Sequence, residues 1–113
     1  MRIIRKPWGH EEIWAETDKY VGKILYIRAG HRLSLQYHER KTETVRVMQG
    51  VLHLVEGLPE GGTRDRTLQA GESFHVSVGT VHRFGAGDVD VTLVEVSTPE
   101  LEDVVRLEDD YVR

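Results

Sequence analysis

Three side chains of types that bind metal ions, Gln36, His38 and Glu43, lie close together in the sequence. Amide oxygens, imidazole nitrogens and carboxylate oxygens all serve as ligands for divalent cations. Residues two apart on a β-strand point to the same face and lie roughly 7 Å apart, so Gln36 and His38 can converge on one ion. The turn at 39–42 then returns Glu43 beside them. The pattern indicates a metal site, although a solvated sheet face would account for the same residues.

Two predicted strands, 32–38 and 43–50, would position these side chains. Glu43 shares a face with Val45 and Val47, because side chains alternate along a strand, so it should point to the interior. A carboxylate there is costly unless it is paired, and a cation is one suitable partner. The alternation therefore favours an interior site.

The remaining sequence is typical of an all-β protein, because short β-branched and aromatic runs are separated by Gly, Pro and Asp. We expect further strands at 11–16, 20–28, 51–57, 73–76, 81–86 and 91–97, with a turn-rich loop at 57–65. So many short strands predict a small β-barrel or two-sheet jelly roll. A short C-terminal helical turn is also expected, with Ser97 or Thr98 as its cap and Pro99 at its first position.

Composition limits the possible functions. The chain has 113 residues, enough for a single domain, and a formal net charge of −4. A mildly acidic chain without a basic run gives no support for binding nucleic acid or a membrane, and the N-terminus has no apolar signal segment, so we expect a cytoplasmic protein. There is no Cys, so a metal must be held by nitrogen and oxygen atoms.

Two spacings resemble the motifs of the cupin superfamily, G-x5-H-x-H-x3,4-E-x6-G and G-x5-P-x-G-x2-H-x3-N. Residues Gly30, Gln36, His38, Glu43 and Gly50 fit the first, with Gln36 at the first His position. Residues Gly71, Ser77, Gly79 and His82 fit the second, with Ser77 in place of Pro and Ala86 in place of Asn. The resemblance implies a cupin barrel, also called a double-stranded β-helix.

A narrower resemblance covers nearly the whole chain. The segments "KPWGHEEIW", "GHRLSLQYH", "VGTVHRF" and "EDVVRLEDDYVR" are similar to the cupin domain of type II mannose-6-phosphate isomerases, in which Gln is usual at the first ligand position. The resemblance implies that Gln36, His38, Glu43 and His82 bind a divalent metal ion, zinc first, with manganese, nickel, cobalt or iron as alternatives. The chain departs from the family pattern at Glu39, Arg40, Thr44, Val45 and Val112, which puts the identity of the sugar in question.

The function implied is metal-dependent aldose–ketose isomerisation of a sugar phosphate such as mannose-6-phosphate. Two alternatives stay open: a metal-binding cupin that acts as a carbohydrate-binding or sensory module, and oxygen chemistry at bound iron. Candidate contacts for the phosphate are Lys23, Arg32 and Arg113, and His53 is a weak candidate for the base. Lys23 shares a strand face with apolar residues, and an inward lysine is unusual. A homodimer is expected, largely by resemblance to other cupins.

Overall fold

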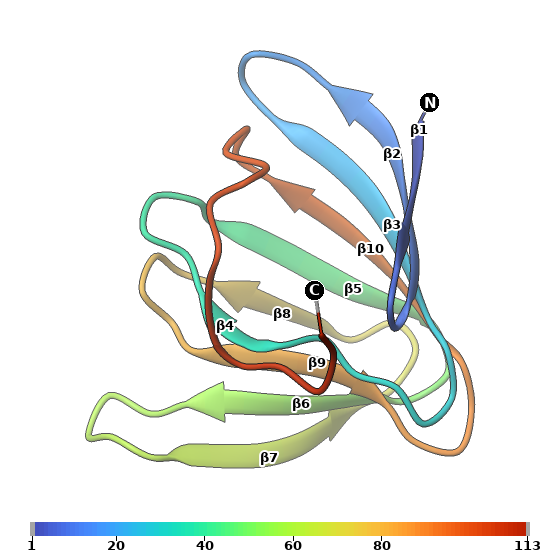
Figure 1. The fold of residues 1–113 in the computed structure, drawn as a ribbon, viewed down its shortest axis with the longest axis vertical. Helices are drawn as coiled ribbons and strands as arrows, with labels where there is room; N and C mark the ends of the chain where they lie inside the picture. The colour runs from blue at the N-terminus through green and yellow to red at the C-terminus, as the bar shows by residue number, and fades with distance from the viewer. Residues whose placement is uncertain (1, 113) are drawn as a thin grey trace.

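The structure, a computed structural model, describes residues 2–112 and has eleven β-strands and no helix within that range (Figure 1). The strands are β1 (Arg2–Lys6), β2 (Gly9–Glu16), β3 (Val21–Ile27), β4 (Leu35–Tyr37), β5 (Glu43–Gln49), β6 (Leu52–Gly57), β7 (Thr63–Leu68), β8 (Ser73–Val76), β9 (His82–Ala86), β10 (Val91–Ser97) and β11 (Val105–Glu108). Within the same residues, nothing helical is long and apolar enough to span a lipid bilayer.

The strands form two antiparallel sheets that face each other. One sheet has the order β1-β2-β3-β10-β5-β8 and the other has the order β11-β4-β9-β6-β7 (Figure 1). Strands distant in the sequence, such as β3 and β10, are neighbours, as in a jelly roll. The predicted all-β, two-sheet jelly roll is therefore confirmed.

Alternation along the strands sends apolar side chains between the two sheets. In β10, Val91 and Leu93 are fully buried while Val96 is 52% exposed on the outer face. The buried core combines residues from both sheets: Trp8, Leu25, Ile27, Leu33, Val45, Val47, Leu52, Leu54, Leu68, Val76, Phe84, Val91 and Leu93. Each buried Val, Leu, Ile or Phe side chain contributes roughly 1.5–3 kcal/mol relative to an exposed one, so this core supplies the main driving force for the fold.

Three strands give weak sequence signals, and all three lie at the edge of a sheet. These are β1, β7 and β11, which have a neighbour on one side only. An edge strand buries less surface and carries more charge, as the sequences RIIRK and TRDRTL illustrate. The loop predicted at 57–65 is therefore shorter than expected, because β7 begins at Thr63.

The predicted C-terminal helical turn is wrong. The segment after β10 forms tight turns instead, for example a hydrogen bond from the Leu101 amide to the Pro99 carbonyl of 2.8 Å. The Thr98 hydroxyl, expected to cap a helix, donates to Glu100 Oε1 at 2.7 Å. The Thr98 amide also donates to the Thr42 carbonyl. Pairing with the turn before β5 thus prevails over the local helix signal.

We call residues 98–111 the C-terminal strap. Figure 1 shows this segment, in red, leaving β10 in the six-stranded sheet and crossing to the other sheet, where β11 pairs with β4. The strap thereby borders the space between the sheets on the side where the candidate ligands lie.

Candidate metal centre

The four predicted ligands come from both sheets. Gln36 lies on β4 and pairs directly with His82 on β9. His38 follows β4, and Glu43 begins β5 in the opposite sheet. The three residues His38, Glu43 and His82 are all buried, at 2%, 4% and 1% exposure.

The nitrogen and oxygen atoms of this trio converge. His38 Nε2 lies 2.9 Å from Glu43 Oε1, and His82 Nε2 lies 3.3 Å from the same oxygen. One ligand atom from each of the three residues fits within 4.8 Å of the others, so the group is compact enough to hold a metal ion.

Both imidazole rings are oriented by backbone carbonyl groups. His38 Nδ1 lies 2.6 Å from the Asp103 carbonyl oxygen, and His82 Nδ1 lies 2.9 Å from the Thr80 carbonyl oxygen. A carbonyl oxygen only accepts hydrogen bonds, so each Nδ1 must carry a proton. In a neutral ring, Nε2 then presents its lone pair, which is the form that binds metals.

With both rings neutral, the trio therefore directs three electron pairs at one point, and the 2.9 Å hydrogen bond between His38 Nε2 and Glu43 Oε1 in the metal-free protein needs a proton in that place. Two unprotonated Nε2 atoms and a carboxylate oxygen repel one another unless a positive charge lies between them. His82 Nε2 is also buried without a hydrogen-bond partner among the described residues, because its contact with Glu43 lacks hydrogen-bond geometry. Such an atom is costly in a folded protein, and a divalent cation would remove the cost. The residues present thus fit a metal ion.

Gln36 completes the polar face of β4. Its Oε1 accepts a hydrogen bond of 2.7 Å from the Ser34 hydroxyl, and Ser34 itself is buried. An amide oxygen has two lone pairs, so this bond leaves one free to face an ion. Ser34 therefore orients the amide of Gln36.

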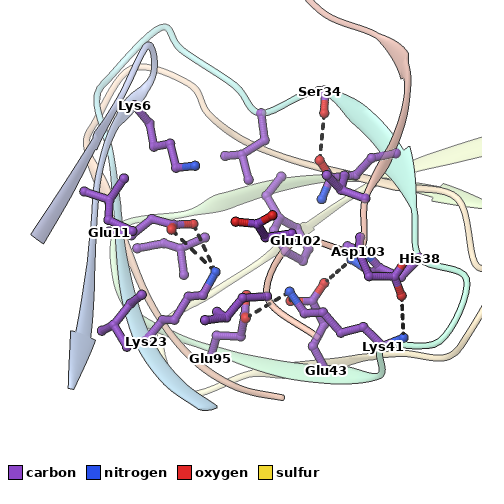
Figure 2. A pocket seen from close by; sticks show the side chains of 18 of the residues that line it. Lys6, Glu11, Lys23, Ser34, His38, Lys41, Glu43, Glu95, Glu102 and Asp103 are labelled. Carbon is purple, nitrogen blue, oxygen red and sulfur yellow. Dashed lines mark hydrogen bonds and ion pairs between the residues drawn. The ribbon is translucent and has the colours of Figure 1, made fainter. Parts of the chain in front are cut away.

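A cavity of about 520 Å³ opens beside the trio. Figure 2 shows its polar wall, on which acidic and basic side chains alternate: Glu11, Lys23, Glu95, Lys41 and Glu43. Lys23 Nζ lies 3.4 Å from a Glu11 carboxylate oxygen. Lys41 Nζ lies 3.6 Å from Glu95 Oε2 and 3.8 Å from Glu43 Oε2. Both buried lysines are thus paired with carboxylates.

The two neighbouring acids on this wall differ in protonation. Burial raises the pKa of Glu95 well above its usual range, and the negative charge of Glu43 raises it further. Burial alone would do the same to Glu43, but its contacts with the side chains of Glu95, His38 and His82 hold the Glu43 pKa well below its usual range. Glu43 is therefore the ionised member of the pair, as a metal ligand must be.

The three basic residues predicted to contact the substrate phosphate, Lys23, Arg32 and Arg113, do not share one site. Lys23 is in the cavity, on the inner face with Val21 and Leu25. Arg32 does not line this cavity. Its guanidinium group contacts Asp110, and it lines a second cavity beyond β9. The backbone at 32–34 is irregular rather than a strand, so the predicted alternation does not reach Arg32. Arg113 lies outside the described residues.

The weak base candidate, His53, is exposed and packs against the backbone of Gly87. It lines the second cavity and is not brought to the trio.

Three cavity residues were not singled out from the sequence. Glu95 shares the buried face of β10 with Val91 and Leu93, so strand alternation contained a signal for it. Lys41 lies in a turn, where no periodicity applies. Arg106 lies opposite Gln36 in the pairing of β11 with β4 and lines the cavity, but β11 itself was not predicted.

Comparisons with known proteins identify a family and support the fold. Residues 1–109 match a family model described as mannose-6-phosphate isomerase C-terminal. Mannose-1-phosphate guanylyltransferase ManC of Salmonella typhimurium is 29% identical over 99% of this chain, which spans only 23% of that protein's length. Among solved structures, KdgF from Halomonas sp. is similar with a TM-score of 0.74 and 22% identity, covering 88% of each chain.

A Bacillus subtilis oxalate decarboxylase, described with Mn(II) centres, has a TM-score of 0.80 at 18% identity and covers 95% of this chain and 30% of its own. At these identities the structural likenesses show the fold alone.

Proposed function

The chain belongs to the mannose-6-phosphate isomerase C-terminal family, and on that premise we propose that it is a metal-dependent aldose–ketose isomerase acting on a sugar phosphate. The observation that carries the proposal is the convergence of two imidazole Nε2 atoms and one carboxylate oxygen beside a polar cavity. In the proposed centre the ligands are Gln36, His38, Glu43 and His82.

Two neutral imidazoles, an amide and one carboxylate would leave a divalent ion with net positive charge. A divalent ion held there supplies Lewis acidity, which polarises a carbonyl or hydroxyl oxygen of a sugar. Zinc suits nitrogen and oxygen ligands, and the Mn(II) centres of the oxalate decarboxylase support manganese as the second metal to test.

The cavity wall supplies groups for an open-chain or cyclic sugar. Lys23 and Lys41 would donate hydrogen bonds to sugar oxygens, while Glu11 would accept them from hydroxyl groups. The phosphate is assigned to Arg106, because this exposed arginine lines the same cavity beside Gln36, and guanidinium groups bind phosphate in a bidentate manner.

The test is interconversion of mannose-6-phosphate and fructose-6-phosphate by purified protein, first treated with a chelator and then supplied with zinc or manganese. We expect turnover only with metal, and its loss in Glu43→Gln. Glu39→Gln, an exposed carboxylate near the same turn, is the matched control and should keep activity. Absence of turnover with every divalent metal would contradict the proposal.

A second candidate is a sugar-binding module without catalysis. It is favoured by the pairing of both buried lysines with carboxylates, which leaves the inner wall without an excess cation and suits an uncharged sugar. Binding of mannose without turnover of mannose-6-phosphate, measured by calorimetry on the metal-loaded protein, would favour this alternative.

A further inference from the structure

Asp103 is one of the strap residues that fasten the C-terminal strap to the turn before β5, beside the metal centre. The carboxylate of Asp103 accepts hydrogen bonds from the backbone amides of Glu39 at 3.0 Å, Arg40 at 2.7 Å and Lys41 at 2.8 Å. These three consecutive amides form the turn between His38 and β5. Asp103 therefore holds the turn that separates two of the candidate ligands in the sequence.

The backbone of the same residue holds the His38 ring. The Asp103 carbonyl oxygen lies 2.6 Å from His38 Nδ1, the shortest of the contacts that orient the trio. Figure 2 shows Asp103 beside His38 at the edge of the cavity. One strap residue thus contacts the ligand ring through its carbonyl group and the following turn through its carboxylate.

We propose that Asp103 is a positioning residue of the metal centre, which keeps His38 Nε2 directed at Glu43 from outside the ligand set. The inference rests on the proposed metal site but goes beyond it, because it makes ligand geometry depend on a separate segment of the chain. In Asp103→Asn one acceptor oxygen is replaced by an NH2 group, so at least one of the three turn amides faces a donor, the strap backbone shifts, and the Nδ1 contact that fixes the ring weakens.

The far end of the strap offers a matched control. Asp110 is also a carboxylate on the strap, and it is fastened by Arg32 through Nε at 2.6 Å and Nη2 at 3.0 Å. It lines the second cavity and contacts none of the four proposed ligands in the described structure. Asp103→Asn and Asp110→Asn therefore each remove one strap charge with the same change in shape, and only the first should disturb the centre.

The first measurement is the zinc affinity of the full chain, by competition with a coloured chelator. Partners that orient metal-binding histidines typically account for about 10–100-fold in affinity, and we expect a loss of that order in Asp103→Asn. Asp110→Asn should stay within about twofold of the unchanged protein. A loss of less than fivefold in Asp103→Asn, or an equal loss in both variants, would overturn the proposal.

The second measurement separates this inference from the proposed function. Nitrogen NMR of the His38 ring in metal-free protein reports which nitrogen carries the proton. We expect a proton on Nδ1 in the unchanged protein and in Asp110→Asn, and its loss in Asp103→Asn, which leaves the Nε2–H form bonded to Glu43. An unchanged tautomer in Asp103→Asn would overturn the positioning role. Zinc binding without isomerase activity would remove the proposed function and leave this inference standing.

Discussion

Lys41 provides the sharpest stability test of the buried charges. Its side chain is 6% exposed, and its ammonium group lies 3.8 Å from Glu43 Oε2 and 3.6 Å from Glu95 Oε2. Since the pKa of Glu95 is raised and that of Glu43 is lowered, Glu43 is the partner that carries the negative charge opposite the Lys41 ammonium group. Burial lowers the Lys41 pKa, but the neighbouring Glu95 and Glu43 side chains together raise it above its usual value, so the lysine stays charged.

Substitution of Lys41→Met leaves the Glu43 carboxylate without a cation in the metal-free protein. The Coulomb energy of the pair is roughly 4 kcal/mol at an effective dielectric constant of about 20. Removing one member of a buried ion pair typically costs about 3–5 kcal/mol of unfolding free energy, which agrees with that value. With bound zinc, the ion itself offsets the Glu43 charge, so we expect a smaller loss.

The assay is urea unfolding of chelator-treated and zinc-loaded protein. With a denaturant slope of about 2 kcal/mol per molar, the midpoint of Lys41→Met should fall by about 2 M without metal. Lys19→Met, which changes an exposed lysine, is the control and should stay within about 0.5 kcal/mol. If the unfolding free energy of metal-free Lys41→Met lies within about 1 kcal/mol of that of the unchanged protein, the reasoning is refuted.

Three further predictions concern the strap, a turn and the cavity mouth. The Asp110 pKa is lowered, chiefly by its hydrogen bond with an arginine. The stability it contributes is therefore present above its usual pKa of about 3.9 and lost as the pH falls further, so the protection of strap amides against hydrogen exchange, relative to unfolded chain at the same pH, should fall below about pH 4, and less so in Asp110→Asn. Gly50→Ala should cost more than about 2 kcal/mol in thermal or urea unfolding, because φ is +83° and a Cβ would lie 2.3 Å from the Asp90 carbonyl oxygen. Gly61 also has a positive φ, but an added Cβ would have open space around it, so Gly61→Ala should cost only the backbone strain of about 1–2 kcal/mol. Equal losses of unfolding free energy in Gly50→Ala and Gly61→Ala would count against the steric argument. Arg106→Gln should raise KM for mannose-6-phosphate at least tenfold with kcat changed less than threefold, and an unchanged KM would remove Arg106 from the phosphate site.

The fold could be predicted because its central strands carry strong alternation. Val91, Leu93 and Glu95 on β10 illustrate this, since apolar neighbours reveal which face is buried. The edge strands β1, β7 and β11 could not be predicted in the same way, because one free edge and exposed faces weaken the pattern. The missing helical turn has a related cause: Thr98 bonds with Thr42, and a contact between segments so distant in sequence leaves no local signal.

The residues of the candidate site show the same difference between local sequence signals and contacts between distant segments. Gln36, His38 and Glu43 follow from local spacing, and His82 follows from the second motif. The expected positions of Arg32 and His53 depended on extending strand alternation or on residue type alone. The roles now given to Lys41, Asp103 and Arg106 arise from a turn and a strap packed against β4, which no periodicity could reveal.

The central claim is that His38, Glu43 and His82, with Gln36, hold one divalent ion between the sheets. Calorimetric titration of zinc into chelator-treated protein tests it most directly, with His82→Ala and Glu43→Gln compared against His53→Ala. The account predicts one ion per chain, retained in His53→Ala and lost in the other two. Full zinc binding by His82→Ala, or its loss in His53→Ala, would contradict the account.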